Sequence, residues 1–197
     1  MTQPSAEAPA ADDAEGPPRK RSGTRQVVEW LILIAAALAL ALLIKAFLFQ
    51  AFYIPSESMV PALEKHDRVL VNKLSYKLHP VHRGDIVVFK APPGVDPSVK
   101  DLVKRVIALP NETISGRNGR VFIDGKRLAE PYLPKGTISD FNGLQPFKVP
   151  PDTYWVMGDN RQNSHDSRLF PSHVIRKKDI VGRVFVRIWP LNRIDLL

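Results

Sequence analysis

Hydrophobic and polar residues are distributed unevenly along this chain of 197 residues. Residues 30–44 are uninterruptedly apolar (WLILIAAALALALLI), and the apolar character continues beyond Lys45 as far as Phe49. The residues before this run are rich in proline, alanine and acidic side chains and show no hydrophobic periodicity. Because such a composition buries too little apolar surface to fold, we predict a disordered tail over residues 1–26.

The apolar run itself predicts a membrane-spanning helix, which we place at residues 27–49. Its strict core is shorter than the roughly 20 residues that cross a bilayer, so a cleaved signal peptide is the alternative. Cleavage requires small residues after the run, and this chain has Phe47, Phe49, Phe52 and Tyr53 there instead. We therefore expect a retained signal anchor.

Basic residues in front of the run predict the orientation of this helix. Cytoplasmic flanks of membrane helices carry an excess of lysine and arginine, which predicts a cytoplasmic N-terminus. The sequence therefore predicts a single-pass protein with a cytoplasmic tail and an extracytoplasmic domain. The basic residues concerned are Arg19, Lys20, Arg21 and Arg25.

The rest of the chain alternates short β-branched and aromatic runs with turn-forming residues. This pattern favours an antiparallel sheet or barrel over repeated β-α-β units. We expect a mainly β domain over residues 50–197, with no helix apart from a turn after Ser58. The expected strands are residues 68–71, 85–89, 102–109, 121–123, 154–157 and 184–188.

Composition narrows the chemistry that this domain performs. The chain has no cysteine, which excludes disulfides, thiol nucleophiles and thiolate metal sites. Its five histidines show no metal-ligand spacing with one another or with a carboxylate, so we expect no metal site. The net charge of +8 suits nucleic acid or an anionic bilayer surface, and the membrane segment favours the bilayer.

A proline-flanked stretch, residues 55–63 (PSESMVPAL), follows the apolar run and carries the hydroxyls of Ser56 and Ser58. Serine is a poor nucleophile until a base removes its proton. By composition alone, this stretch is an ordinary linker that leaves the membrane. A nucleophilic role for it therefore requires a base elsewhere in the chain.

The strand expected at residues 102–109 offers such a base. Alternation along a strand places Lys104 on the same face as Leu102 and Val106, and Arg105 on the opposite face. Burial on that face disfavours the ammonium form and lowers the pKa of the lysine, which makes neutral amine available as a general base. A lysine at a strand edge whose ammonium reaches water is the alternative.

A polar loop, residues 158–168 (GDNRQNSHDSR), follows the strand expected at 154–157. Its two aspartates and two arginines are suited to ion pairs that fix the loop, and Ser164 is suited to hold a neighbouring amine by a hydrogen bond. A solvated turn is the alternative.

Together and in this order, the three segments resemble the type I signal peptidases, the membrane-bound S26 peptidases with a Ser/Lys dyad. The resemblance includes residues 84–89 (GDIVVF) and extends from the apolar run to about Val184. It implies a serine endopeptidase of the bacterial plasma membrane that removes signal peptides from preproteins after small residues of the Ala-x-Ala type. It also implies no cofactor, the bilayer and the secretion translocon as partners, and no nucleic acid.

The resemblance also implies roles for particular residues. Ser58 is the nucleophile and Lys104 the general base. Ser164 orients the lysine, and the Ser56 hydroxyl forms the oxyanion hole with the Ser58 N–H. Four residues are implied to form ion pairs around the site, and which acid pairs with which base stays open: Arg105, Asp159, Asp166 and Arg168. Five others are implied to form the apolar lining of the substrate pockets: Phe52, Ile54, Met59, Leu63 and Val103.

The sequence departs from the family pattern after Arg168, where residues 169–173 (LFPSH) and the basic residues 176–178 stand in place of a glycine and a hydrophobic pair, and at two earlier places. Glu57 stands where the family often has glycine, and residues 108–111 (ALPN) stand where it usually has Gly-x-Pro-Gly. None of these departures removes a reacting group, so they bear on the fit of the substrate.

Three other hypotheses stay open at this point. A peptidase of the same class that processes one dedicated partner, such as a pilin, carries the same motifs. A noncatalytic, membrane-tethered basic module has no need for Ser58, Lys104 and Ser164 together. A Ser/His/Asp triad is compatible with the five histidines and several aspartates.

Overall fold

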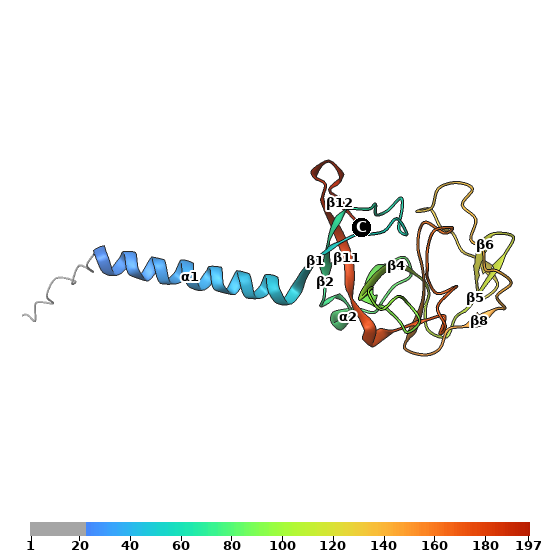
Figure 1. Cartoon of the computed structure of the whole chain (residues 1–197). Helices are drawn as coiled ribbons and strands as arrows, with labels where there is room; N and C mark the ends of the chain where they lie inside the picture. Colours follow the sequence, from blue (N-terminus) through green and yellow to red (C-terminus); the bar gives the residue numbers. More distant parts are fainter. Residues whose placement is uncertain (1–22) are drawn as a thin grey trace, which may run out of the picture. The chain divides into compact units, whose positions relative to one another are not determined.

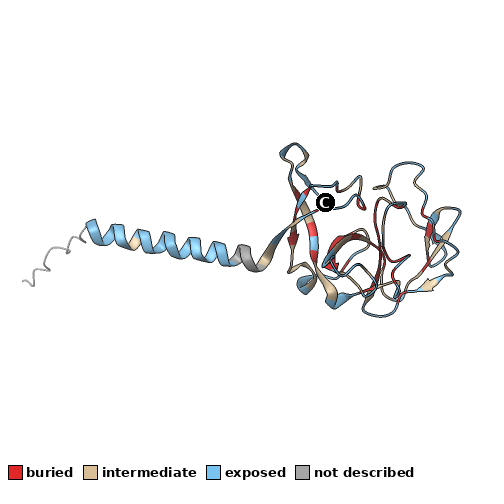
Figure 2. Cartoon of the chain, viewed as in Figure 1, coloured by how far each residue is buried: buried red, intermediate tan, exposed pale blue. Residues whose placement is uncertain are grey.

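The computed structural model describes residues 23–197 and divides into two units, Met1–Ala41 and Leu42–Leu197. The first unit consists, in its described part, of helix α1 (Gly23–Leu48), which continues into the second unit (Figure 1). Residues Gly23–Leu43 of this helix are long and apolar enough to cross a membrane, and Figure 2 shows them exposed along almost their whole length. The tail expected over residues 1–26 lies almost wholly outside the described residues.

A mainly antiparallel β domain follows the helix, which confirms the expected fold class. Its larger sheet has eight strands, and every pair of neighbours is antiparallel. The strand order is β1 (Phe49–Tyr53), β2 (Arg68–Asn72), β11 (Ile180–Trp189), β3 (Ile86–Lys90), β4 (Asp101–Ala108), β9 (Thr153–Met157) and β10 (Ile175–Arg176), with β12 (Asp195–Leu196) paired to β11.

A second, smaller antiparallel sheet has four strands. Its order is β7 (Lys126–Arg127), β6 (Arg120–Ile123), β5 (Thr113–Arg117) and β8 (Phe147–Lys148). Helical structure in residues 49–197 is limited to single turns. These turns are α2 (Ser75–Leu78) and the 3₁₀ segments Lys177–Asp179 and Leu191–Arg193.

Three apolar clusters form the core. Neighbouring residues of β3, Val87 and Val88, belong to two different clusters, because side chains alternate between the faces of the larger sheet. The third cluster packs the small sheet against β9 around Trp155, whose ring stacks on Phe141 at 6.1 Å between centroids. β4 therefore runs through the middle of the core.

Of the strands that the sequence pattern did not predict, two were missed for identifiable reasons. Strand β1 continues the apolar run without a break, so only its pairing with β2 marks it as an extended segment. Strand β5 contains Gly116, which weakens a strand pattern. A Cβ at Gly116 would lie 2.2 Å from the Phe141 ring, so the glycine is explained by tight packing.

Candidate active site

Ser58 and Lys104 meet in the core of the second unit. Ser58 lies in the turn between β1 and β2, where the Leu63 N–H donates to Met59 O at 2.9 Å, and Lys104 lies in the middle of β4. Ser58 Oγ and Lys104 Nζ are 2.6 Å apart. Lys104 is only 2% exposed and Ser58 9%, so the contact is shielded from water.

The surroundings of Lys104 favour its neutral form. Burial lowers the pKa of Lys104 to about 8, while the charges of Asp166 and Asp159 raise it and that of Arg168 lowers it. About a tenth of the lysine is then neutral at pH 7. Because a lysine with a lowered pKa lies in contact with a serine hydroxyl, the pair is suited to general-base activation of a nucleophile. The alternative of a lysine whose ammonium reaches water does not hold.

Two potential donors for an oxyanion lie beside the Ser58 hydroxyl. Ser56 Oγ is 3.3 Å from Ser58 Oγ and belongs to an exposed residue. Within residues 23–197, the Ser58 N–H donates to no acceptor, so it is available to a ligand. A hydroxyl and a backbone N–H beside a nucleophile are the kinds of donor that stabilise a tetrahedral intermediate.

Ser164 lies against the backbone of the nucleophile. A Cβ placed on Gly158 would be 2.3 Å from Ser164 Oγ and 2.4 Å from Ser58 O, which shows how closely the three residues pack. Ser164 Oγ is buried and has no hydrogen-bond partner in the described part of the chain. A hydrogen bond to Lys104 is therefore absent from this structure, and the orienting role of Ser164 stays a prediction.

The structure resolves the pairing of the four expected ion-pair residues. Arg105 donates to Asp159 through Nε at 2.9 Å and Nη2 at 2.6 Å, and Arg168 donates to Asp166 through Nε at 2.9 Å and Nη2 at 2.8 Å. Asp166 also accepts from the Gly158 N–H at 3.0 Å. Removing one partner of a buried pair costs about 3–5 kcal/mol, so these contacts strongly favour one loop conformation.

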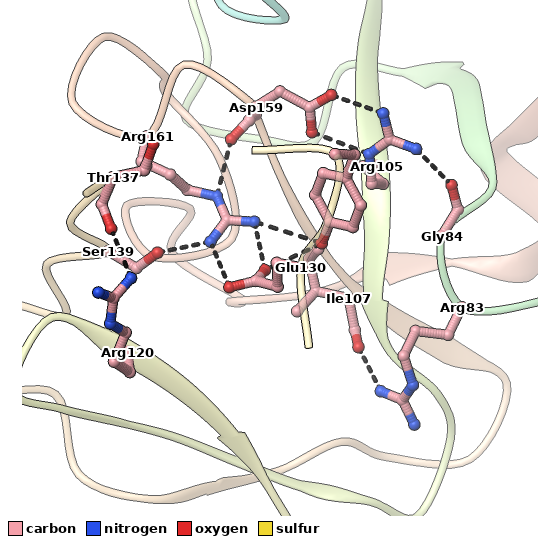
Figure 3. A network of polar contacts seen from close by, with 12 residues as sticks. Arg83, Gly84, Arg105, Ile107, Arg120, Glu130, Thr137, Ser139, Asp159 and Arg161 are labelled. Atoms are coloured by element: carbon pink, nitrogen blue, oxygen red, sulfur yellow. Dashed lines mark hydrogen bonds and ion pairs between the residues drawn. The ribbon is translucent and has the colours of Figure 1, made fainter. Parts of the chain in front are cut away.

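A further network joins this loop, through Arg161, to the segment 130–139, which no sequence motif marked (Figure 3). Arg161 is 2% exposed, donates to Gly158 O at 3.1 Å and pairs with Glu130 at 2.5 Å. It also donates to Ser139 Oγ. The Tyr132 ring lies under the Arg105 guanidinium at 4.1 Å, which connects the two networks. No local signal identifies Glu130 or Tyr132, because both lie in an irregular segment.

A cleft with a volume of about 550 Å³ opens beside the Ser58–Lys104 contact. One of its walls is the first half of β4, whose residues pair with β3 from Asp101 to Arg105 but with β9 only from Arg105 onward. The other edge of β4 is therefore open to a ligand strand over residues 101–104. The cleft is lined by Pro55, Ser56, Glu57, Ser58, Lys65, Gly94, Val95, Asp96, Val99, Leu102, Lys104, Asn163 and His165.

The five apolar residues expected to line the substrate pockets gather in one cluster. None of them is among the residues that line the cleft. Three are fully buried and two are partly buried at the margin of the same core, so they anchor the turn that carries Ser58 in this core. Their contact with substrate stays a prediction. They are Ile54, Met59 and Leu63, and Phe52 and Val103.

The described histidines offer no obvious base or metal site. Within residues 23–197, no histidine hydrogen-bonds to Ser58, and no three His, Asp or Glu side chains gather closely enough to hold a metal ion. His165 is the histidine that lines the cleft. The structure therefore places Lys104, and none of the histidines, in contact with the nucleophile.

Comparison with known proteins gives a consistent result. The family model "Signal peptidase, peptidase S26" matches residues 27–189. A signal peptidase I from Leptolyngbya laminosa is 40% identical over 198 residues, 98% of this chain and 94% of that protein. Signal peptidase I P from Bacillus subtilis subsp. natto is 40% identical over 183 residues, 89% and 95% of the two chains. A solved signal peptidase I from Enterococcus faecalis aligns with a TM-score of 0.42 and 28% identity, over 53% of this chain and 97% of that chain. Because the family model spans most of the sequence, this chain belongs to the signal peptidases of peptidase family S26.

Proposed function

We propose that this protein is a membrane-anchored signal peptidase that cleaves signal peptides from exported preproteins, with Ser58 as nucleophile and Lys104 as general base. The observation that carries the proposal is the 2.6 Å contact between Ser58 Oγ and the buried Lys104 Nζ. The names of the similar proteins support the substrate class, since each is described as a signal peptidase I.

The geometry supports a two-step acyl transfer. Neutral Lys104 accepts the Ser58 hydroxyl proton as Oγ attacks the scissile carbonyl carbon, and the oxyanion accepts hydrogen bonds from the Ser56 hydroxyl and the Ser58 N–H. The Lys104 ammonium then protonates the leaving amine, which is the new N-terminus of the mature protein. In the second step Lys104 activates a water that hydrolyses the Ser58 ester and releases the signal peptide.

The open edge of β4 supports binding of the substrate as an added strand. Residues 101–104 offer backbone donors and acceptors to an extended peptide, as in other cases of strand addition. In an extended peptide, alternate side chains point the same way, so the first and third residues before the scissile bond face the protein together. This alternation accounts for the spacing of an Ala-x-Ala pattern, in which two selected residues are separated by one.

An exposed apolar hairpin, which strands β11 and β12 form at the end of the chain, supports contact of the domain with lipid. Arg187 joins this hairpin to the turn that carries Ser58, because its Nη1 donates to Ala62 O at 2.7 Å. Exposed apolar side chains that gather on one element commonly mark a membrane or protein contact. The translocon stays a predicted partner. The exposed residues are Trp189, Leu191, Ile194 and Leu196, which are 49%, 68%, 57% and 78% exposed.

Cleavage of a preprotein tests the proposed function directly. Purified full-length protein in detergent is expected to cut a preprotein at an Ala-x-Ala site, and Ser58→Ala is expected to reduce the rate by at least about 10³-fold while retaining the fold. Mass spectrometry of both products locates the cut. Cleavage of one pilin-like partner but of no ordinary preprotein would support the dedicated peptidase instead. Equal activity of Ser58→Ala and wild type would contradict the proposal.

The membrane orientation is a separate prediction. The basic residues from Arg19 to Arg25 predict a cytoplasmic N-terminus, so protease added to intact spheroplasts is expected to digest residues 50–197. An antibody against a C-terminal tag follows the loss of the domain, and a cytoplasmic protein serves as the control for leakage. A protected domain, together with a digested N-terminal tail, would reverse the orientation.

A further inference from the structure

One residue of the loop after β9, Asn160, holds the backbone on both sides of Ser58. Its N–H donates to Ser58 O at 3.1 Å, and its Nδ2 donates to Glu57 O at 3.2 Å. These carbonyls belong to the two peptide planes that flank the Ser58 Cα. Asn160 therefore restrains the rotation of both planes, although it is not among the residues that line the cleft.

The Glu57–Ser58 peptide also contains the N–H that is available to an oxyanion. In a trans peptide the C=O and the N–H point in opposite directions. The Glu57 carbonyl accepts from Asn160 Nδ2 and from the Val60 N–H, each at 3.2 Å. Holding this carbonyl toward the loop consequently directs the Ser58 N–H away from the loop.

The loop that carries Asn160 is itself firmly held. The Asn163 N–H donates to Asn160 O at 2.9 Å, which closes a turn around the residue. The next residue, Arg161, is anchored through its buried ion pair with Glu130. Gly158 allows the loop to approach Ser58 O, where any Cβ would collide. The position of the Asn160 amide is thus set by contacts that are independent of the substrate.

We propose that Asn160 is a positioning residue, whose side-chain amide fixes the Glu57–Ser58 peptide so that the Ser58 N–H points at the oxyanion of the tetrahedral intermediate. This inference rests on the proposed function and deepens it. An oxyanion donor acts over about 2.7–3.1 Å, so a modest rotation of this peptide weakens the hydrogen bond. The effect reaches the transition state through the backbone, without contact between Asn160 and substrate.

Two substitutions of Asn160 test the proposal in the full-length protein. Asn160→Ala removes the Nδ2 donor, and Asn160→Asp keeps the shape but presents an acceptor to the Glu57 carbonyl; both leave the backbone N–H in place. We expect kcat for an Ala-x-Ala peptide to fall about tenfold to hundredfold, with KM within about twofold of wild type, because the lost contact acts in the transition state. Gln162→Ala is the matched control, since Gln162 is an exposed residue of the same loop and is expected to leave kcat unchanged.

Two readouts separate this role from a merely structural one. A peptide aldehyde, which forms a tetrahedral adduct with Ser58, is expected to lose affinity in parallel with kcat, whereas the corresponding peptide alcohol binds unchanged. The acidic limb of the pH profile of Asn160→Ala is expected to stay where it is in wild type, because this substitution introduces no charge near Lys104, whereas the added carboxylate of Asn160→Asp raises the pKa of Lys104. If Asn160→Ala is unfolded at the assay temperature, the isosteric Asn160→Asp supplies the measurement.

The outcomes are distinct. Unchanged kcat in both variants, an equal loss of affinity for aldehyde and alcohol, or a displaced acidic limb in the uncharged variant Asn160→Ala would each overturn the positioning role while leaving the proposed function intact. A wild-type protein that forms no aldehyde adduct and cleaves no peptide would fail the proposed function itself, and the role of Asn160 with it.

Discussion

Replacing Lys104 by arginine is expected to abolish cleavage although the positive charge is retained. The guanidinium group does not deprotonate in proteins, so it is unable to accept the Ser58 proton. We expect kcat/KM to fall by at least about 10³-fold, at the upper end of the effects seen when a general base is lost. Lys104→Met, which is close in length and neutral, is expected to be equally inactive. Inactivity of Lys104→Met would show that the larger size of the guanidinium group is not the cause of the loss in Lys104→Arg.

The matched control for this experiment is Lys65→Arg. Lys65 lines the same cleft but is exposed, so the same substitution is expected to leave most activity in place. His165→Gln is the second control, because His165 is the histidine that lines the cleft. An active Lys104→Arg enzyme, or a histidine variant that is folded and inactive, would contradict the Ser/Lys dyad and favour a triad.

The pH dependence of cleavage follows from the titration of Lys104. Burial lowers the pKa of Lys104 to about 8, and the neutral form is the active one, so activity is lost as the pH falls through this value. Well below it, kcat/KM is expected to fall about tenfold per pH unit. A profile of kcat/KM between pH 5 and pH 10 measures the limb. An acidic limb near the ordinary pKa of histidine, about 6.5, would instead indicate an imidazole base.

Gly158→Ala is also expected to have a large effect on cleavage. The new Cβ would lie 2.3 Å from Ser164 Oγ and 2.4 Å from Ser58 O, both closer than nonbonded atoms approach. Ser164 Oγ belongs to a rotatable side chain, but Ser58 O is part of the backbone and moves only if the nucleophile moves with it. A displacement of about 1 Å costs roughly 10²-fold in rate, so we expect at least that loss in kcat.

Gly182→Ala is the matched control for crowding. Its Cβ would lie 2.4 Å from Asn72 O, a backbone carbonyl oxygen of the larger sheet outside the catalytic cleft. This variant is therefore expected to lower the melting temperature while the folded protein retains its kcat. Thermal unfolding and steady-state kinetics on both variants separate the two effects. Wild-type kcat in Gly158→Ala, or a loss fully accounted for by unfolding, would show that the close packing around Ser58 is not required.

The proposed catalytic residues were recognised in the sequence mainly through its resemblance to the type I signal peptidases, because composition alone favoured a linker at residues 55–63. Ser56 and Ser58 stand two positions apart in a proline-flanked turn, and alternation alone placed Lys104 on a different face from Arg105. Both patterns are local, so they survive without knowledge of the fold. The apolar helix was recognisable for the same reason, although the structure starts it at Gly23 and converts Phe49 into the first residue of β1.

The sequence by itself thus determined an apolar N-terminal helix, a mainly β domain and the residue types of a Ser/Lys site. The tertiary structure decided which partners those residues have. Ser58 and Lys104 are 46 positions apart, and only the packing of the turn against β4 brings them to 2.6 Å. The choice of Asp159 by Arg105, and the contact of Asn160 with Glu57 O, likewise depend on distant segments. Many side chains carry the same charge or the same hydrogen-bonding groups, so the sequence leaves open which of them pair with one another. Close packing in three dimensions selects one arrangement, and the same packing removes the water that would otherwise keep Lys104 charged.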